Sequence, residues 1–141
     1  MEMAKLSQGE LLIQLTNLQT KIQSHLNRSL SLYGIGFTEY LVLRSLSAAP
    51  TGKMRRIDLA HAIGLSASGV TRVLNPMEKI GLVEKDHVER DARVRLVALT
   101  ETGTKIFQEA NTSFNQVAES LLTPINPDKQ KSLAKLVNAL L

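Results

Sequence analysis

The sequence predicts a mainly α-helical protein with a small two- to three-stranded β-sheet. Within residues 57–75, apolar positions have the spacing of two helices joined by a tight turn. Ala60 is small enough for the point where the helices touch, and Gly64 suits a turn position that needs a positive φ. A short basic hairpin follows, and leucine-rich helices flank both ends. This is the plan of a winged helix-turn-helix with a helical dimerisation bundle formed by the N- and C-terminal helices.

The charge of the chain is concentrated in this central region. The 141 residues include 17 basic and 13 acidic side chains, for a net charge of +4. Nine of the basic and six of the acidic residues lie between Lys53 and Arg95. A length of 141 residues suits one compact domain, or a small domain with added dimerisation helices. The local excess of positive charge favours a nucleic-acid partner.

Several classes of protein are excluded by what the sequence lacks. There is no cysteine, so disulfides, thiolate zinc sites and a thiol-based redox switch are impossible. No apolar run is long enough to cross a membrane, and the N-terminus has no signal-peptide core. We therefore expect a cytoplasmic protein without a membrane partner.

The first helix is expected over residues 7–32, where leucine and isoleucine recur every three or four positions. Two glycines at 34 and 36 interrupt it. The next helix is expected to restart with Thr38 as its capping residue and a hydrophobic staple between Phe37 and Val42, and to end near Ser47. The first helix is either an ordinary core helix or docks through its N-terminal half on a second subunit. The small size of the domain favours the second interpretation.

A third helix over residues 55–63 begins with Arg55 and Arg56, where the helix dipole disfavours positive charge. Arginines in this place indicate an external anion, and a phosphate at the helix N-terminus is the obvious candidate. A solvated basic turn is the alternative.

The fourth helix is expected to be capped by Ser66 and ended by Gly81. In a helix-turn-helix the second helix lies in the major groove, with its N-terminal residues nearest the base edges. Arg72 is predicted either to read guanine through a bidentate contact or to hold only a phosphate. Pro76 removes one helical amide and is expected to kink or tighten the helix beyond its base-reading end. The polar residues predicted to face DNA are Ser66, Ser68, Thr71, Arg72 and Asn75.

Two strands are expected over residues 82–86 and 93–99, with a connection between them that carries Arg90. Arg90 and Arg93 would reach the minor groove or the flanking phosphates. A solvated hairpin without DNA contacts is the alternative.

Helices complete the chain after this hairpin. Thr100 is expected to cap a helix that runs to about Leu122, and Asn126 followed by Pro127 is a strong start for the last one. Leucines continue to the end of the chain, where they would fray unless buried. We therefore expect residues 1–34 and 104–141 to form the dimerisation region, and residues 35–103 the winged helix-turn-helix.

Three stretches carry a family resemblance. They are FTEYLVLRSL, DLAHAIGLSASGVTRVLNPMEKIGLV and DARVRLVALTETG. With these, nearly the whole chain resembles the MarR family of bacterial transcriptional regulators. The resemblance implies a homodimer that binds a pseudo-palindromic operator, usually as a repressor, with Arg93 as the wing arginine. It also implies a small, often phenolic, effector bound between the dimerisation and DNA-binding regions. Because the chain has no cysteine, such an effector must act by binding. Pro76 departs from the family, many of whose members have a charged residue there.

Other chemistry finds little support in the sequence. The three histidines lie far apart and lack the spacing of metal ligands, and neither a phosphate-binding loop nor a nucleophile elbow is present. We expect no enzyme, no metal and no cofactor. Four aromatic residues are candidates for an effector pocket, with plain core packing as the favoured alternative: Tyr33, Phe37, Tyr40 and Phe107. The rival function is a protein-interaction module or antirepressor that does not bind DNA.

Overall fold

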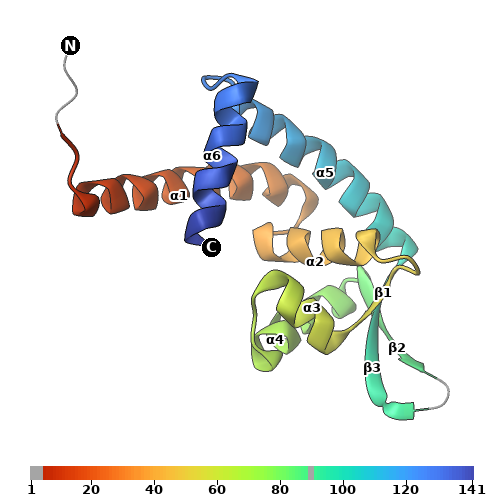
Figure 1. Cartoon of the computed structure of the whole chain (residues 1–141). Coiled ribbons are helices and arrows are strands. Elements are labelled where there is room, and N and C mark those ends of the chain that lie inside the picture. The colour runs from red at the N-terminus through yellow and green to blue at the C-terminus, as the bar shows by residue number, and fades with distance from the viewer. Residues whose placement is uncertain (1–4, 89–90) are drawn as a thin grey trace.

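The computed structural model describes residues 5–88 and 91–141, and only the backbone of residues 87, 88 and 91–94. Within these ranges it contains helices and a three-stranded antiparallel sheet, which confirms the predicted fold class (Figure 1). The elements in chain order are α1 (Gln8–Leu30), the 3-10 turn η1 (Ser31–Tyr33), α2 (Phe37–Ala48), β1 (Lys53–Arg55), α3 (Arg56–Ile63), α4 (Ala67–Lys79), β2 (Val83–Val88), β3 (Asp91–Leu99), α5 (Glu101–Leu122) and α6 (Pro127–Leu140).

Helix α2 is the centre of the fold. It contacts α1 and α5 on one side and α3, α4 and β3 on the other. Four of its side chains, Tyr40, Val42, Leu43 and Leu46, are completely buried. Because α2 packs against both groups, it couples the terminal helices to the helix-turn-helix. The hairpin of β2 and β3 projects beside α3 and α4 (Figure 1).

The sheet has the strand order β1-β3-β2, and all its pairs are antiparallel. The predicted sheet had two or three strands, and β1 is the third. Because Arg55 ends β1, α3 begins at Arg56 instead of Arg55. β2 and β3 also run further than predicted, to Val88 and from Asp91. Three residues of the expected connection, His87, Val88 and Asp91, are thus paired, with a register shift between His87 and Val88. Each further pair satisfies backbone groups that a loop would leave to water.

A capping side chain begins each of four helices. Three of these caps, Ser66, Thr100 and Asn126, were predicted and are confirmed. Ser66 accepts a hydrogen bond from the amide of Gly69 at 3.1 Å, and Thr100 and Asn126 do the same for α5 and α6. At α1, Ser7 and Glu10 form a reciprocal capping box. These contacts are local in sequence, which is why the sequence alone predicts them.

The predicted start of α2 is wrong. Its N-cap is Gly36, which has an extended backbone and no capping side chain, and Thr38 lies inside the first turn. The expected staple between Phe37 and Val42 is lost with this shift, since Phe37 is the first helical residue. Gly34, at φ +75°, turns the chain early enough for α2 to begin before Thr38.

Pro76 lies within α4, which continues for three more residues to Lys79. Its side chain is exposed, so the ring faces solvent rather than the core. Gly81, at φ +78°, follows the end of the helix as expected. The recognition segment before Pro76 is therefore helical throughout.

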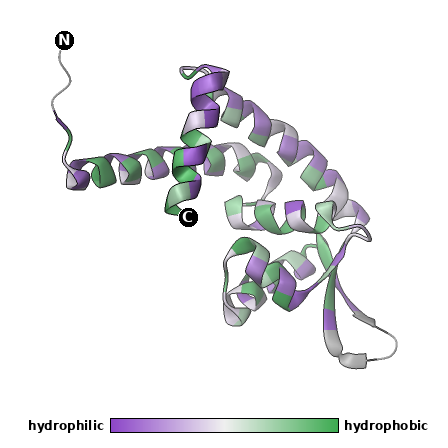
Figure 2. Ribbon diagram, viewed as in Figure 1, coloured by the Kyte–Doolittle hydropathy of each residue, from purple (hydrophilic) through white to green (hydrophobic). Residues whose placement is uncertain are grey.

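Apolar side chains remain exposed on α1 and α6. Figure 2 shows hydrophobic residues along both helices. On α1 only Leu26 and Leu30, near its end, are buried, whereas Leu12 is 65% exposed. α6 buries none of its residues, and Leu140 is 76% exposed. A single chain therefore leaves the N-terminal part of α1 and the apolar residues of α6 exposed.

Candidate nucleic-acid interface

The turn between α3 and α4 has the geometry that the sequence predicts. Gly64 is left-handed, with φ +70°, and ends α3. Ala60 is buried at the crossing, where its carbonyl oxygen accepts a hydrogen bond from the amide of Leu65 at 3.0 Å. Ser66 then starts α4. Two helices separated by so short a turn form a compact helix-turn-helix.

The polar face of α4 lies open to solvent. Its five predicted DNA contacts are all exposed: Ser66, Ser68, Thr71, Arg72 and Asn75. The opposite face is at most 1% exposed and packs the helix onto α2, α3 and β2: Val70, Leu74 and Met77. The Arg72 side chain has no hydrogen bond or ion pair with any residue that the structure describes. Its guanidinium is therefore available to an external partner.

The two arginines before α3 have different local partners. Arg55 lies 3.5 Å from the carboxylate of Asp58 in an exposed ion pair. Arg56 donates from Nη2 to Oγ1 of Thr71 at 2.9 Å and so connects α3 to α4. The sequence predicts both residues at the interface, but it does not predict this connection, which joins positions 15 apart.

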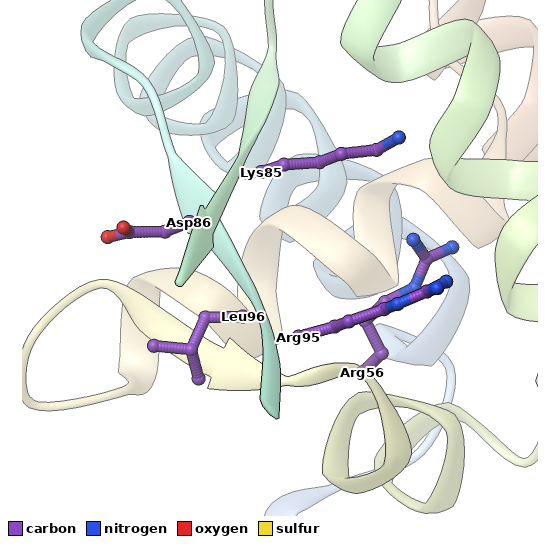
Figure 3. A pocket seen from close by; sticks show the side chains of 5 residues that line it. All are labelled: Arg56, Lys85, Asp86, Arg95 and Leu96. Atoms are coloured by element: carbon purple, nitrogen blue, oxygen red, sulfur yellow. The ribbon is translucent and has the colours of Figure 1, made fainter. Parts of the chain in front are cut away.

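Three cations from different elements line one hollow of about 270 Å³: Arg56, Lys85 and Arg95. In Figure 3 the guanidinium groups of Arg56 and Arg95 lie next to one another, and Lys85 points to the same side of the sheet. A second hollow, of about 510 Å³, is lined by Arg56, Arg95 and Thr71 among others. The positive charge therefore continues from the sheet to α4.

Lys85 and Arg95 were missing from the predicted contacts. The alternation along β3 could have indicated Arg95, because it shares a face with Val97, which is fully buried. A cation two residues from a buried position lies where the sheet meets the helices. The same alternation along β2 places Lys85 on the face of Val83, which is buried.

Acidic side chains near these cations are paired. Asp86 forms an ion pair with Lys53 and points to the opposite side of the sheet from Lys85 (Figure 3). This contact raises the pKa of Lys53, chiefly through the hydrogen bond to the carboxylate. Lys85 lies 3.8 Å from Glu78. The side of the sheet that faces α3 thus keeps its positive character.

Two predicted wing contacts lie where the structure describes no side chain. Arg90 lies outside the described residues, and only the backbone of Arg93 is described, within β3.

The aromatic candidates for an effector pocket pack closely together. The Tyr40 ring stacks on Phe114 at a centroid distance of 4.5 Å and lies 5.8 Å from Phe107, while Phe37 stacks on Phe114 at 6.3 Å. Tyr33 shares a hydrogen bond of 2.7 Å with Ser113, and the Tyr40 hydroxyl donates to Asn111 at 2.6 Å. This cluster joins α2 to α5, and therefore joins the winged helix to the terminal helices.

Tyr40→Phe is expected to flatten the dependence of stability on alkaline pH. Burial raises the pKa of the Tyr40 phenol above its ordinary value of 10.0. Above that pH the unfolded chain loses the proton while the folded chain keeps it, so folding weakens as pH rises. Urea unfolding between pH 8 and 11 measures this slope. Parallel profiles for the parent and the variant would contradict the assignment to Tyr40.

Neither metal chemistry nor membrane insertion finds support in the described ranges. No cluster of three or more His, Asp or Glu side chains there is placed to hold a metal ion. None of the described helices combines the length and apolar character of a membrane span.

This geometry defines a class of protein: a winged helix-turn-helix whose recognition helix is exposed beside a projecting hairpin. The sequence model of the MarR family matches residues 37–94, which run from the start of α2 into β3. Residues 37–94 of this chain therefore match the MarR family, which the three sequence motifs resemble.

Known proteins of this kind resemble most of the chain. The transcriptional repressor MprA of Escherichia coli strain K12 is 24% identical over 125 residues, which cover 89% of this chain and 71% of the relative. A MarR family regulator from Streptomyces coelicolor, solved in complex with DNA, has a TM-score of 0.85 at 22% identity, covering 99% of this chain and 89% of that one. An organohalide-sensing regulator in its 2,4-dichlorophenol bound form has a TM-score of 0.86 at 21% identity, covering 96% and 80%.

Proposed function

We propose that this protein is a transcriptional regulator that binds double-stranded DNA in a sequence-specific manner. The observation that carries the proposal is the exposed polar face of α4, bordered by the cations of α3 and the sheet. A helix presented in this way fits the major groove, and the cations suit the phosphates beside it. The relatives support this proposal, since the E. coli protein is a repressor and the Streptomyces structure contains DNA.

The DNA-binding form is proposed to be a homodimer. The exposed leucines of α1 and α6 need a partner, and a second copy of the chain supplies the same apolar surface. A two-fold dimer would place two α4 helices in successive major grooves, ~34 Å apart. In this division, residues 1–34 and 104–141 hold the dimer together, and residues 35–103 bind DNA.

Repression relieved by a small aromatic effector is the proposed form of regulation. The repressor activity of the E. coli relative and the dichlorophenol-bound structure support it. Tyr33, Phe37, Tyr40 and Phe107 are the proposed effector contacts, because their cluster lies where the two regions meet. An effector that separates these rings would change the spacing of the two α4 helices.

A non-enzymatic role in the cytoplasm completes the proposal. The relatives are described as regulators of transcription, and DNA is the partner for which the cations of the interface are suited.

Arg72→Ala tests whether α4 reads a base. If Arg72 contacts guanine, the variant is expected to bind its site roughly 1–3 kcal/mol more weakly and to lose preference at one position. The measurement is a gel shift at one fixed salt concentration, with the DNA duplex upstream of the protein's own gene and with an unrelated duplex. Lys129→Ala removes the same charge at the start of α6 and serves as the control.

The two duplexes also separate the alternatives. An equal loss of affinity for both would assign Arg72 to a phosphate. A parent protein that binds neither duplex would contradict DNA binding and favour a protein-interaction module.

A further inference from the structure

The hollow between α3 and the sheet gathers more positive charge than the described residues neutralise. Of its three cations, Lys85 has a carboxylate partner, Glu78 at 3.8 Å. Arg56 and Arg95 have no ion pair with any described residue. Their guanidinium groups lie next to one another, and the one carboxylate of the lining, Asp86, points to the other side of the sheet (Figure 3). Two neighbouring guanidinium groups with no carboxylate of a described side chain between them suit an external anion.

The position of this hollow identifies the anion. It lies between α4, which fits the major groove, and the projecting β2–β3 hairpin, which fits the adjacent minor groove. Major and minor grooves of a duplex are separated by one sugar-phosphate strand. A duplex bound in this way must therefore pass one strand over the hollow, and each phosphate on that strand is an anion that arginine binds in a bidentate manner.

Thr71 shows a second consequence of the Arg56 contact. Its Oγ1 accepts from Arg56 Nη2 at 2.9 Å and donates to the carbonyl oxygen of Ala67 at 3.2 Å. The one hydroxyl proton is thus used within the helix, and one lone pair is used by the arginine. What Thr71 presents to an incoming base is mainly its methyl group, which suits the methyl group of thymine.

We propose that Arg56 and Arg95 together bind one phosphate of the DNA backbone, and that Arg56 is also a positioning residue that turns the methyl group of Thr71 toward the bases. This inference deepens the proposed function and rests on it. Arg56 has several N–H groups, so one can hold Thr71 while others face the phosphate.

The salt dependence of binding tests the shared phosphate. Arg95→Ala is expected to weaken binding by a similar factor on the protein's own upstream duplex and on an unrelated duplex. Arg56→Ala is expected to weaken binding to both, and to weaken binding to the upstream duplex more, because it also releases Thr71. In the double variant, the slope of log K against log salt should fall in magnitude by about one, as for one lost phosphate contact. Its affinity should fall by less than the product of the two single effects.

Other results overturn this assignment. A slope that falls by about two, with multiplicative effects, would place the arginines on separate phosphates. Unchanged binding, or changes no larger than those of the control Lys129→Ala, would remove them from the interface. A parent protein that binds neither duplex would overturn the proposed function and the shared phosphate together. If the parent binds DNA and the variants bind it equally well, only the shared phosphate is overturned.

Two substitutions at Thr71 test whether its methyl group contacts a base. Thr71→Val keeps a methyl group and removes the hydroxyl, whereas Thr71→Ser keeps the hydroxyl and removes the methyl. We expect Thr71→Val to retain the preference for the upstream duplex over the unrelated one, and Thr71→Ser to reduce it. The reverse order, or two variants that both behave like the parent, would show that the methyl group does not contact a base.

Discussion

Gly103→Ala is expected to destabilise the protein by about 3 kcal/mol or more, at the upper end of the range for inserted atoms in a packed core. Gly103 is buried in the first turn of α5, directly beside the end of the sheet. A Cβ atom there would lie 2.0 Å from the carbonyl oxygen of Leu82 and 2.9 Å from a methyl carbon of Leu99. Leu82 O also accepts hydrogen bonds from the amide and the hydroxyl of Thr100, so the strand cannot move away without losing them.

The control for this prediction is another helical glycine in a first turn. A Cβ atom at Gly9 in α1 would have its nearest neighbour, Ser7 Oγ, at 3.9 Å, which is an ordinary contact. Gly9→Ala should therefore be neutral or stabilise by up to about 1 kcal/mol, because alanine favours the helix. Urea unfolding of both variants at the same pH measures the difference. Equal stabilities would contradict the close packing at Gly103.

The combined substitution of Leu136→Asp and Leu140→Asp is expected to convert a dimer into monomers at micromolar concentration. Both leucines lie on one apolar face of α6 and are 66% and 76% exposed in the single chain. Buried between subunits, an unpaired aspartate costs about 3 kcal/mol or more. A cost of this size raises the dissociation constant of the dimer by more than about hundredfold.

Sedimentation velocity measures this effect, and circular dichroism checks the fold of the monomer. The single chain should stay folded, because α6 buries no residue in it. Asn138→Asp adds a charge on the opposite side of α6 and should leave the dimer intact. If the double variant sediments as the parent does, α6 lies outside the interface. Operator affinity should fall together with the dimer, since one subunit reaches one half-site.

Much of the fold was predictable because its determinants are local. Ser66, Thr100 and Asn126 each cap a helix through an amide three residues away, and Gly64 turns the chain between two helices. The motif that resembles the MarR wing lies in a continuous stretch as well. The exception was Thr38, where the backbone freedom of two nearby glycines allowed the helix to begin earlier than its best capping residue.

The sequence by itself determined the helix-turn-helix, the exposed polar face of α4 and the apolar faces of the terminal helices, because each depends on residue spacing within one element. Only the tertiary structure decided that β1 joins the sheet, that Arg56 holds Thr71, and that Arg95 lies beside Arg56. These contacts join residues between 15 and about 45 positions apart. Packing around α2 brings their elements together, and no local periodicity encodes which side chains then meet.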